Sequence, residues 1–323
     1  MRALVIGAGA VGARAVRQLV ESPEVRRVLV ADTDAGRQAA VVETSGDKAR
    51  RGDHDDAADV VVLAGPCGSH LAEARLHLAA GRPVVSTSDA IADVRGLLDL
   101  DAEARARSVP VVAGAAFSPG LSCLLARHAA HRFEQVSEVH VARSGTGGPA
   151  CARQHHGALT GEGLDWRDGG WQRRRAGSGR ELCFFPDPVG GQDCYRAELP
   201  DSLLLVPAFP GVARVTARMA ATRRDRLSAH LPMLRRPHPE GLVGAVRVEV
   251  RGRLDGVSDT LVLGALDRPA VAAGAVVAQA ARWVAAGRIP PGAGGLAGVS
   301  DPTAFLHELA AVGIKAAVFE GGG

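Results

Sequence analysis

The glycine pattern near the start of the chain constrains the fold more than any other feature. Gly7-Ala8-Gly9-Ala10-Val11-Gly12 follows the apolar run 2–6 and opens an apolar-periodic stretch that ends near Val20. A strand, a glycine turn and a helix in this order, with Asp32 ending the next apolar run twenty positions on, are typical of a dinucleotide-binding βαβ unit. We therefore predict that residues 1–120 form a doubly wound Rossmann domain.

Each glycine of the fingerprint has its own role in such a unit. Gly7 permits the tight turn, Gly9 lets a pyrophosphate approach the backbone, and Gly12 lets the helix pack closely on the strand. The first turn of the helix, with Ala10 and Val11, offers free N–H groups and the positive end of the helix dipole to the phosphates. These residues are candidates for cofactor binding.

The residues after the second predicted strand bear on the choice of cofactor. Asp32, with Thr33 beside it, is placed to accept hydrogen bonds from the adenosine ribose, and its charge repels a 2′-phosphate. Arg37, just beyond, is of the type that holds a 2′-phosphate. We expect NAD as the cofactor, and NADP stays open as the alternative.

The rest of the first 120 residues alternates between short apolar runs and helical segments. Runs 59–64, 83–86 and 109–113 predict buried parallel strands, and segments 69–80 and 91–107 predict the helices between them. Asp34 is expected to cap a further helix that runs to about Val42.

Two segments follow the carboxyl ends of these predicted strands. Ala64-Gly65-Pro66 stands where a doubly wound sheet contacts the nicotinamide end of a cofactor. Asp89 follows the next strand and either lines the substrate side or caps the next helix. We count Ala64, Gly65 and Pro66 as cofactor-binding candidates and Asp89 as a substrate candidate.

The character of the chain changes after Ser118-Pro119-Gly120. A helix is predicted from Leu121 to about His131, and a two-residue periodicity follows in 212–219, 246–251 and 257–263. This pattern predicts an α+β domain, 121–268, built on a mixed or antiparallel sheet. Residues 145–200 are rich in Gly, Pro and Arg and are expected to be long loops. In the last part, 269–323, helices at 270–286 and 303–312 are expected to pack back toward the Rossmann domain, before a short strand at 315–319.

Four segments of the chain resemble the saccharopine dehydrogenase-like NAD(P)-binding oxidoreductases. They are the glycine fingerprint, 60–66, 79–88 and 114–121, in which Ser118-Pro119-Gly120 is similar to the family's entry into its second domain. The resemblance covers residues 1–130 and is absent from 140–265, so it does not supply the substrate. It implies a nicotinamide-dependent oxidoreductase whose second domain carries the substrate site and often the dimer contact. The best-known members reduce an imine formed between an amine and a keto or aldehyde group.

The tyrosine and lysine content argues against two mechanisms. These are the Tyr-x-x-x-Lys catalysis of short-chain dehydrogenases and Schiff-base formation by a lysine. The single tyrosine, Tyr195, has no lysine four residues on, and neither lysine lies near the predicted site. The five cysteines show no zinc-like spacing, so no metal is expected. His155 and His156 are the candidates for proton transfer, with two surface histidines as the alternative. Arg143 is a candidate for binding a substrate carboxylate, as are Arg153 and Arg196.

The remaining composition narrows the partners. The net charge of +3 is scattered, and seven Phe, three Trp and one Tyr form no platform for bases, so nucleic acid is not expected. The run Arg173-Arg174-Arg175 either holds an anionic group or is a solvated loop. No apolar run is long enough to span a membrane, and the chain opens directly on a strand, which favours a cytoplasmic protein without a signal peptide.

The function favoured by these observations is hydride transfer to or from a C=N, or C=O, bond of a small polar substrate by an NAD(P)-dependent oxidoreductase. A C=C reductase and a non-catalytic NAD(H)-binding sensor or scaffold are the alternatives. The substrate site is expected between the domains, bounded by Pro66, Asp89, Pro119 and loop 144–156. A homodimer formed mainly by residues beyond about 130 is expected.

Overall fold

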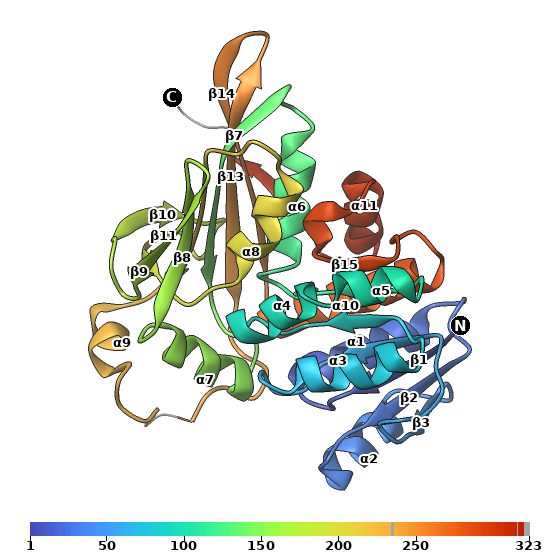
Figure 1. Cartoon of the computed structure of the whole chain (residues 1–323). Coiled ribbons are helices and arrows are strands. Elements are labelled where there is room, and N and C mark those ends of the chain that lie inside the picture. Colours follow the sequence, from blue (N-terminus) through green and yellow to red (C-terminus); the bar gives the residue numbers. More distant parts are fainter. Residues whose placement is uncertain (234–235, 315, 320–323) are drawn as a thin grey trace. The chain divides into compact units, whose positions relative to one another are not determined.

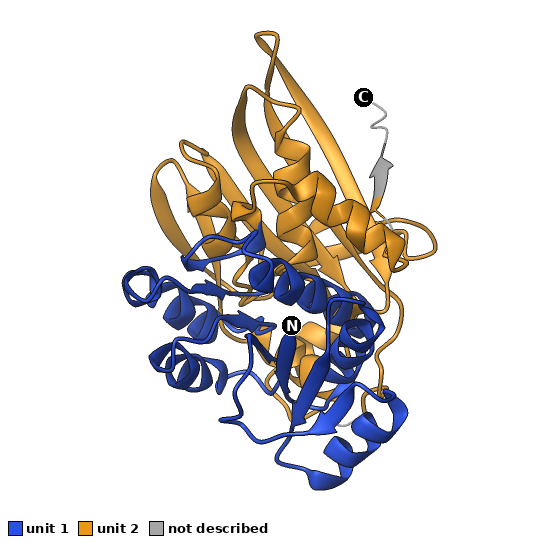
Figure 2. Ribbon diagram, turned by 90° about the vertical axis from the view of Figure 1, so that its right-hand side faces the viewer, with its two compact units in different colours: residues 1–116, 270–296 blue, residues 117–269, 297–323 orange. Residues whose placement is uncertain are grey.

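The computed structural model describes residues 1–233, 236–314 and 316–319, and the chain forms two compact units. Unit 1 comprises residues 1–116 and 270–296, and unit 2 comprises residues 117–269 and 297–323 (Figure 2). Two helices were expected to return to the Rossmann domain. Helix α10 (Pro269–Ala285) belongs to unit 1 from its second residue on, whereas α11 (Pro302–Ala311) belongs to unit 2.

Unit 1 is built on a seven-stranded parallel sheet in the order β15-β6-β5-β4-β1-β2-β3 (Figure 1). The order from β3 through β1 to β6 is that of the dinucleotide-binding fold, so the predicted Rossmann domain is confirmed. The strands are β1 (Arg2–Ile6), β2 (Arg27–Ala31), β3 (Ala49–Arg51), β4 (Val60–Leu63), β5 (Val84–Ser86), β6 (Pro110–Val112) and β15 (Gly292–Gly294). The helices are α1 (Ala10–Glu21), α2 (Ala35–Thr44), α3 (His70–Ala79), α4 (Ile91–Leu98), α5 (Asp101–Ala106) and α10.

Local sequence explains most of these elements. All four residues of β4 are buried, as expected for an apolar strand covered on both faces. Asp34 caps α2, since its Oδ1 accepts from the backbone N–H groups of Gly36 and Arg37 at 3.0 Å each. The helix expected over 91–107 is wrong as one element, because α4 and α5 are separate. The polar segment 46–56, which has no periodicity, contributes β3.

In its described residues, unit 2 is built on a nine-stranded mixed sheet, which confirms the predicted second domain class. Strand β7 pairs with β12 in parallel and with β13 in the antiparallel sense, and β8 and β9 attach beside β12. Helix α6 packs on β13 and β14, α11 packs on α6, and α8 packs on β12. The strands are β7 (Gln135–Ser144), β8 (Glu162–Arg167), β9 (Gly170–Arg175), β10 (Glu181–Phe184), β11 (Gly191–Arg196), β12 (Arg214–Ala220), β13 (Gly244–Leu254), β14 (Val257–Asp267) and β16 (Ala316–Phe319). The helices are α6 (Leu121–Ala130), α7 (Pro149–Ala158), α8 (Asp201–Leu205), α9 (Arg223–Ser228) and α11, with single 3₁₀ turns at Val206–Ala208 and Leu296–Gly298.

The alternation read in β13 is confirmed. Val246, Val248 and Val250 are fully buried, while the residues between them form the polar face. On that face Glu249 pairs with Arg247 at 2.7 Å and with Arg251 at 2.6 Å. The strand expected over 315–319 is β16, and Lys315 lies outside the described residues.

The expectation of long loops over 145–200 is wrong, because this segment contains α7 and strands β8 to β11. Asp168 and Gly169 have φ of 47° and 83°, which is the two-residue hairpin turn that an Asp-Gly pair favours. Trp166 and Trp171 pack edge to face across this hairpin, 5.1 Å apart. Strand β9 does not show the alternation of apolar and polar residues that marks a half-buried strand. Most of its residues are exposed, and its last three are arginines.

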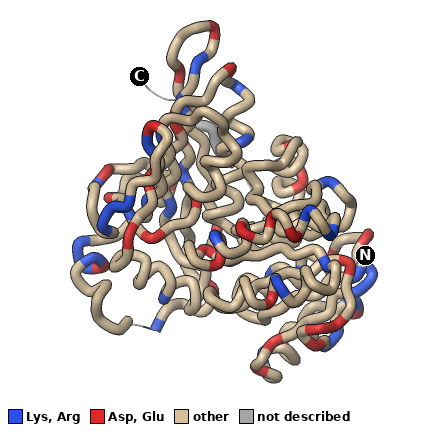
Figure 3. Tube along the Cα trace, viewed as in Figure 1, with Lys and Arg blue, Asp and Glu red and all other residues tan. Residues whose placement is uncertain are grey.

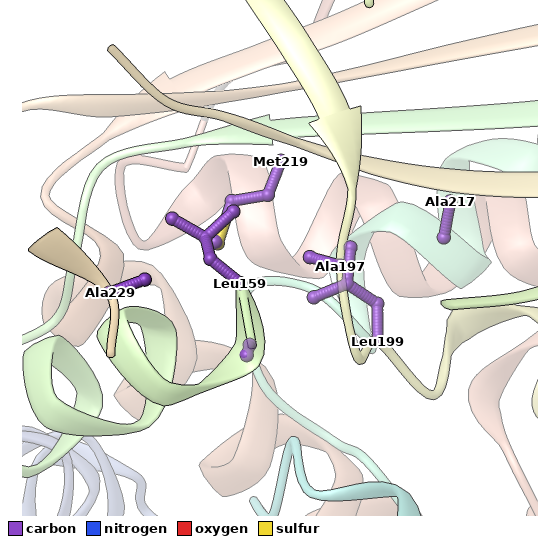
Figure 4. Packing of buried hydrophobic residues seen from close by; sticks show 7 residues of the cluster. Leu159, Ala197, Leu199, Ala217, Met219 and Ala229 are labelled. Carbon is purple, nitrogen blue, oxygen red and sulfur yellow. The ribbon is translucent and has the colours of Figure 1, made fainter. Parts of the chain in front are cut away.

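A small apolar cluster joins α7 to the sheet of unit 2. Leu159, at the end of α7, packs with Ala197, Leu199 and Met219 (Figure 4). Removing these apolar side chains from water stabilises the packing of α7 on the sheet.

Candidate functional site

The glycine loop after β1 lies against the loop after β4. Gly7 has a φ of 107°, and a Cβ there would be 2.6 Å from the backbone of Ala64 and Gly65. A Cβ on Gly12 would be 1.8 Å from the carbonyl oxygen of Gly7. Only glycine fits both positions. Because β1 and β4 flank the point where the strand order reverses, these loops form the crevice in which such sheets bind their ligands.

Gly9 differs from the other two glycines. A Cβ at this position would meet no heavy atom of the described residues within 4 Å. Gly9 is the N-cap of α1, and the first turn, which includes Ala10 and Val11, contains no acidic residue. Its N–H groups are therefore available to an anionic group approaching the open side of Gly9. The loop fits the pyrophosphate of a dinucleotide.

Asp32 is tied to the glycine loop. Its Oδ2 accepts from the backbone N–H of Ala8 at 2.6 Å, and its Oδ1 accepts from the backbone N–H of Asp34 at 2.8 Å and from the Arg37 guanidinium at 3.0 Å. Partial burial raises the pKa of Asp32, but the two backbone hydrogen bonds and Arg37 outweigh it and hold the pKa below its usual value. The carboxylate is thus anionic at neutral pH. Thr33, beside it, is exposed.

A buried histidine connects the ends of β4 and β5. His70 is 1% exposed, and burial lowers its pKa, so the imidazole is neutral. Its Nε2 donates to the Gly65 carbonyl at 3.0 Å, which leaves Nδ1 to accept from the Ser86 hydroxyl at 2.8 Å. This residue fixes the Ala64-Gly65-Pro66 loop, and sequence reasoning missed it. A histidine opening the helix after a strand end was the available signal.

The loop after β4 is held by a second buried group. Asp93, 3% exposed, accepts from the backbone N–H of Gly68 and from the Ser88 hydroxyl, both at 2.7 Å. Asp89 is not the helix cap, because the N-cap of α4 is Ala90. Asp89 instead accepts from the Cys67 thiol at 3.3 Å. Burial, followed by the charge of Asp89, raises the pKa of Cys67 to about 12, so the thiol stays protonated.

In unit 2 the structure brings two of the predicted substrate residues together. The Arg143 guanidinium, which is buried, donates to the carbonyl of Ser118 at 2.5 Å, immediately before Pro119. The hydroxyls of Ser118 and Ser122 both donate to Oδ1 of Asp201 at 2.8 Å. Asp201 is fully buried, and burial raises its pKa against the opposing charge of Arg143. Sequence reasoning missed Asp201, which no motif marks.

The two candidate histidines lie on helix α7, so their placement in a loop is corrected. His155 is 7% exposed, with its Nε2 3.4 Å from the Sγ of Cys151 one turn earlier. His156 donates from Nε2 to the carbonyl of Leu231 at 2.8 Å. The alternative of two surface histidines is therefore wrong for His155. Of the other arginine candidates, Arg153 is exposed on the same helix and Arg196 pairs with Asp165 at 2.7 Å.

No family model matches the chain, and no curated protein matches it by sequence. Solved structures do match it. Apo saccharopine dehydrogenase (L-Glu forming) from Saccharomyces cerevisiae is 17% identical, with a TM-score of 0.72 over 98% of this chain and 99% of that one. The DAP dehydrogenase of C. glutamicum, in complex with DAP, is 13% identical, with a TM-score of 0.51 over 96% and 95%. The amine dehydrogenase from Mycobacterium smegmatis is 13% identical, with a TM-score of 0.53 over 91% and 94%.

The chain has the saccharopine dehydrogenase fold over nearly its whole length. The resemblance seen in residues 1–130 is thereby confirmed as a likeness of fold, and it extends through the middle segment, which carries no resemblance in sequence. The solved structures named above, which share this fold, are dehydrogenases by name. Among the described residues, no helix is both long and apolar enough to cross a membrane.

Proposed function

We propose that the protein is an NAD(P)-dependent oxidoreductase acting on a C=N bond of a small polar substrate, with a C=O bond as the less favoured alternative. The observation that carries the proposal is the glycine loop, closed by Gly7 and Gly12 but open at Gly9, and bonded to the anionic Asp32. The substrate class is supported by the names of the similar structures, which are dehydrogenases of saccharopine, DAP and an amine.

The residues of unit 1 would hold the cofactor. When bound, the nicotinamide supplies the hydride chemistry. The N-terminus of α1 would bind the pyrophosphate across Gly9. Asp32 would accept from the adenosine ribose through Oδ2, which takes one hydrogen bond from Ala8 and can accept another.

NAD is the preferred cofactor in this proposal. Asp32 is anionic, and the Arg37 side chain is engaged by Asp32 at 3.0 Å and Asp34 at 3.6 Å. Two carboxylates around one guanidinium leave net negative charge where the 2′-phosphate of NADP would have to lie. The opposite outcome, NADP preference, requires Arg37 to leave Asp32.

Positioning and proton transfer would fall to other residues. His70 and Asp93 would hold the loop at Gly65 and Pro66 in one conformation. Arg143 would position the backbone at Ser118 and Pro119, because its guanidinium donates to the Ser118 carbonyl. It would not bind the substrate directly. His155 would supply or accept the proton.

The test is direct binding and turnover with the purified chain. Calorimetry with NAD, NADH, NADP and NADPH measures affinity, and mass spectrometry of small molecules released by denaturation identifies a co-purifying ligand. Absorbance at the nicotinamide band then follows turnover with keto acids and amines. No affinity for any dinucleotide would refute the proposal. Affinity without turnover on any carbonyl, imine or enoyl substrate would support the sensor or scaffold alternative.

A further inference from the structure

A cavity of about 370 Å³ lies in unit 2 between the end of α7, the turn after β9, and α9. Its polar lining comes from Thr160, Arg175, Ser178, Arg223, Arg226 and His230. None of these residues has a role in the proposed oxidoreductase site. The cavity includes the last arginine of the run Arg173-Arg174-Arg175, which the sequence leaves open as an anion site.

The charge of the cavity is one-sided. Among the described residues, three guanidinium groups line it, and no Asp or Glu does. Arg175, Arg223 and Arg226 have no carboxylate partner in the part of the chain that the structure describes, whereas Arg173 pairs with Glu162 at 3.4 Å. Figure 3 shows the basic segments of β9 and α9.

The acidic groups next to the lining residues are engaged elsewhere. Glu162, opposite Arg175 in the register of β8 and β9, pairs with Arg173 at 3.4 Å. Asp225, on α9, is engaged in the capping box with Thr222, where Oδ2 accepts from the backbone N–H at 2.8 Å and from the hydroxyl at 2.7 Å. Glu198 lies with its carboxylate against Gly161 and is not a lining residue. The cavity therefore keeps a positive potential that favours an anion.

Arg226 is preorganised for such a ligand. Its guanidinium carbon stacks 4.1 Å from the ring centroid of Tyr195, which is buried and restricts the plane of the guanidinium. The Nε–H of Arg226 is buried and has no acceptor among the described residues. A buried donor without an acceptor is unfavourable, and an oxyanion that accepts from this N–H would relieve it.

Two backbone N–H groups in the turn after β9 are already bonded and are not available to a ligand. The N–H groups of Ala176 and Gly177 donate to the carbonyls of Gly161 and Arg196, at 2.9 and 2.8 Å. Ligand binding would thus use the guanidinium forks, because the hydroxyls of Thr160 and Ser178 already donate to the carbonyls of Gly157 and Arg175. Planar forks suit the paired oxygens of a phosphoryl or carboxylate group. The volume lies at the small end of ligand sites, which run from about 300 to 1,000 Å³.

We propose that this cavity binds a small oxyanion ligand, a phosphorylated or polycarboxylated metabolite, at a site separate from the dinucleotide. Calorimetry at constant ionic strength with inorganic phosphate, pyrophosphate and succinate tests it. Comparing the affinities for phosphate and pyrophosphate with the affinity for succinate shows whether a phosphoryl or a carboxylate group is preferred. Binding is expected for at least one probe in the wild type. Arg223→Ala and Arg226→Gln should each weaken it about 10- to 100-fold.

Matched controls remove the same charge outside the cavity. Arg224→Ala lies on α9 beside Arg223, and Arg174→Ala lies in the same arginine run as Arg175, and both should leave the affinity for the probes unchanged. Arg226→Gln could lower the thermal midpoint because the stacking on Tyr195 is lost. In that case the affinity of the Arg223→Ala variant, which changes an exposed residue, is the test of the proposal. Absence of binding by all three probes, or equal weakening by the controls, would overturn the proposal. NAD affinity should be unchanged in every variant, so this result is independent of the proposed oxidoreductase function.

Discussion

The carboxylate of Asp32 accepts the backbone N–H of Ala8 at 2.6 Å, so the residue that follows β2 also holds the glycine loop that follows β1. The residue proposed to bind the ribose therefore also holds the glycine loop in place. A substitution at Asp32 acts on both, and its effects on affinity and on loop stability have to be separated by a control.

Asp32→Ala should weaken NAD binding about 10- to 100-fold, because the charged hydrogen bonds to the ribose and to Ala8 are both lost. The discrimination against NADP should fall at the same time. Calorimetry with both dinucleotides measures this. Asp34→Ala is the control for NAD affinity alone, because it removes the cap of α2 and about 1 kcal/mol of stability without touching the glycine loop. It also removes a carboxylate beside Arg37, so its NADP affinity is not a control value. A wild type that already prefers NADP would show that Arg37 dominates.

The two glycines Gly9 and Gly12 should respond differently to the same added methyl group. Gly9→Ala should lower dinucleotide affinity while the unfolding temperature stays close to that of the wild type, since its Cβ meets none of the described atoms. Gly12→Ala should lower the unfolding temperature first, because its Cβ would overlap the Gly7 carbonyl oxygen. Scanning calorimetry and binding measured on both variants check this. Equal effects of the two substitutions on affinity and on stability would contradict the assigned roles.

The fold of unit 1 could be predicted because its signals are local. The apolar run of β4 and the cap at Asp34 each need only a few neighbouring residues to be recognised. Strands β8 and β9 could not be recognised from alternating apolar residues. Most positions of β9 are exposed to solvent, and arginines occupy three of them. Their hairpin turn at Asp168 and Gly169 was the signal that remained.

The candidate site could be predicted only in part, for the same reason. The glycine loop is contiguous, whereas Asp201 meets Ser118 across 83 positions of the chain and no spacing rule connects them. His70 and Ser86 are 16 positions apart and meet only because β4 and β5 are adjacent. Side chains whose role depends on which strands pair are visible only once the sheet order is known.

Stability should depend on pH through His77, which is fully buried on α3. Burial, with the charge of Arg82, lowers its pKa to about 4, against about 6.5 in the unfolded chain. Between these values the unfolded state binds more protons than the native state, so stability rises with pH across this window and is fully present above about 6.5. The gain is at most about 3 kcal/mol. Urea unfolding of wild type and His77→Gln from pH 4 to 7 measures it, with the exposed His307→Gln as control. Parallel curves for wild type and His77→Gln would refute the assignment.

Assembly should involve unit 2. Strand β10 is at the end of the sheet, with no strand on its outer side among the residues described, and it exposes Leu182 and Phe184 by 57% and 62%. An apolar edge of this kind favours association with a second copy. Light scattering should give twice the chain mass of 33.3 kDa, and Phe184→Glu should shift it toward the monomer. Val257→Glu, at the tip of the β13–β14 hairpin, is the control. A wild type of single-chain mass at micromolar concentration would exclude the dimer.

His155 is the residue whose removal should affect the proposed reaction most directly. It is buried on α7, and its neighbour His156 is bonded to a backbone carbonyl, so the two imidazoles are not interchangeable. If His155 transfers the proton, His155→Ala should lower kcat about 10²- to 10⁴-fold with little change in NAD affinity, because the cofactor residues belong to unit 1. Gln154→Ala, on the same helix, controls for loss of a polar side chain from α7. His155→Asn keeps a polar group but cannot titrate near neutral pH, and should be as slow as the alanine variant. A His155→Asn protein with full activity would show that His155 only packs α7, and the proton would have to come from another group.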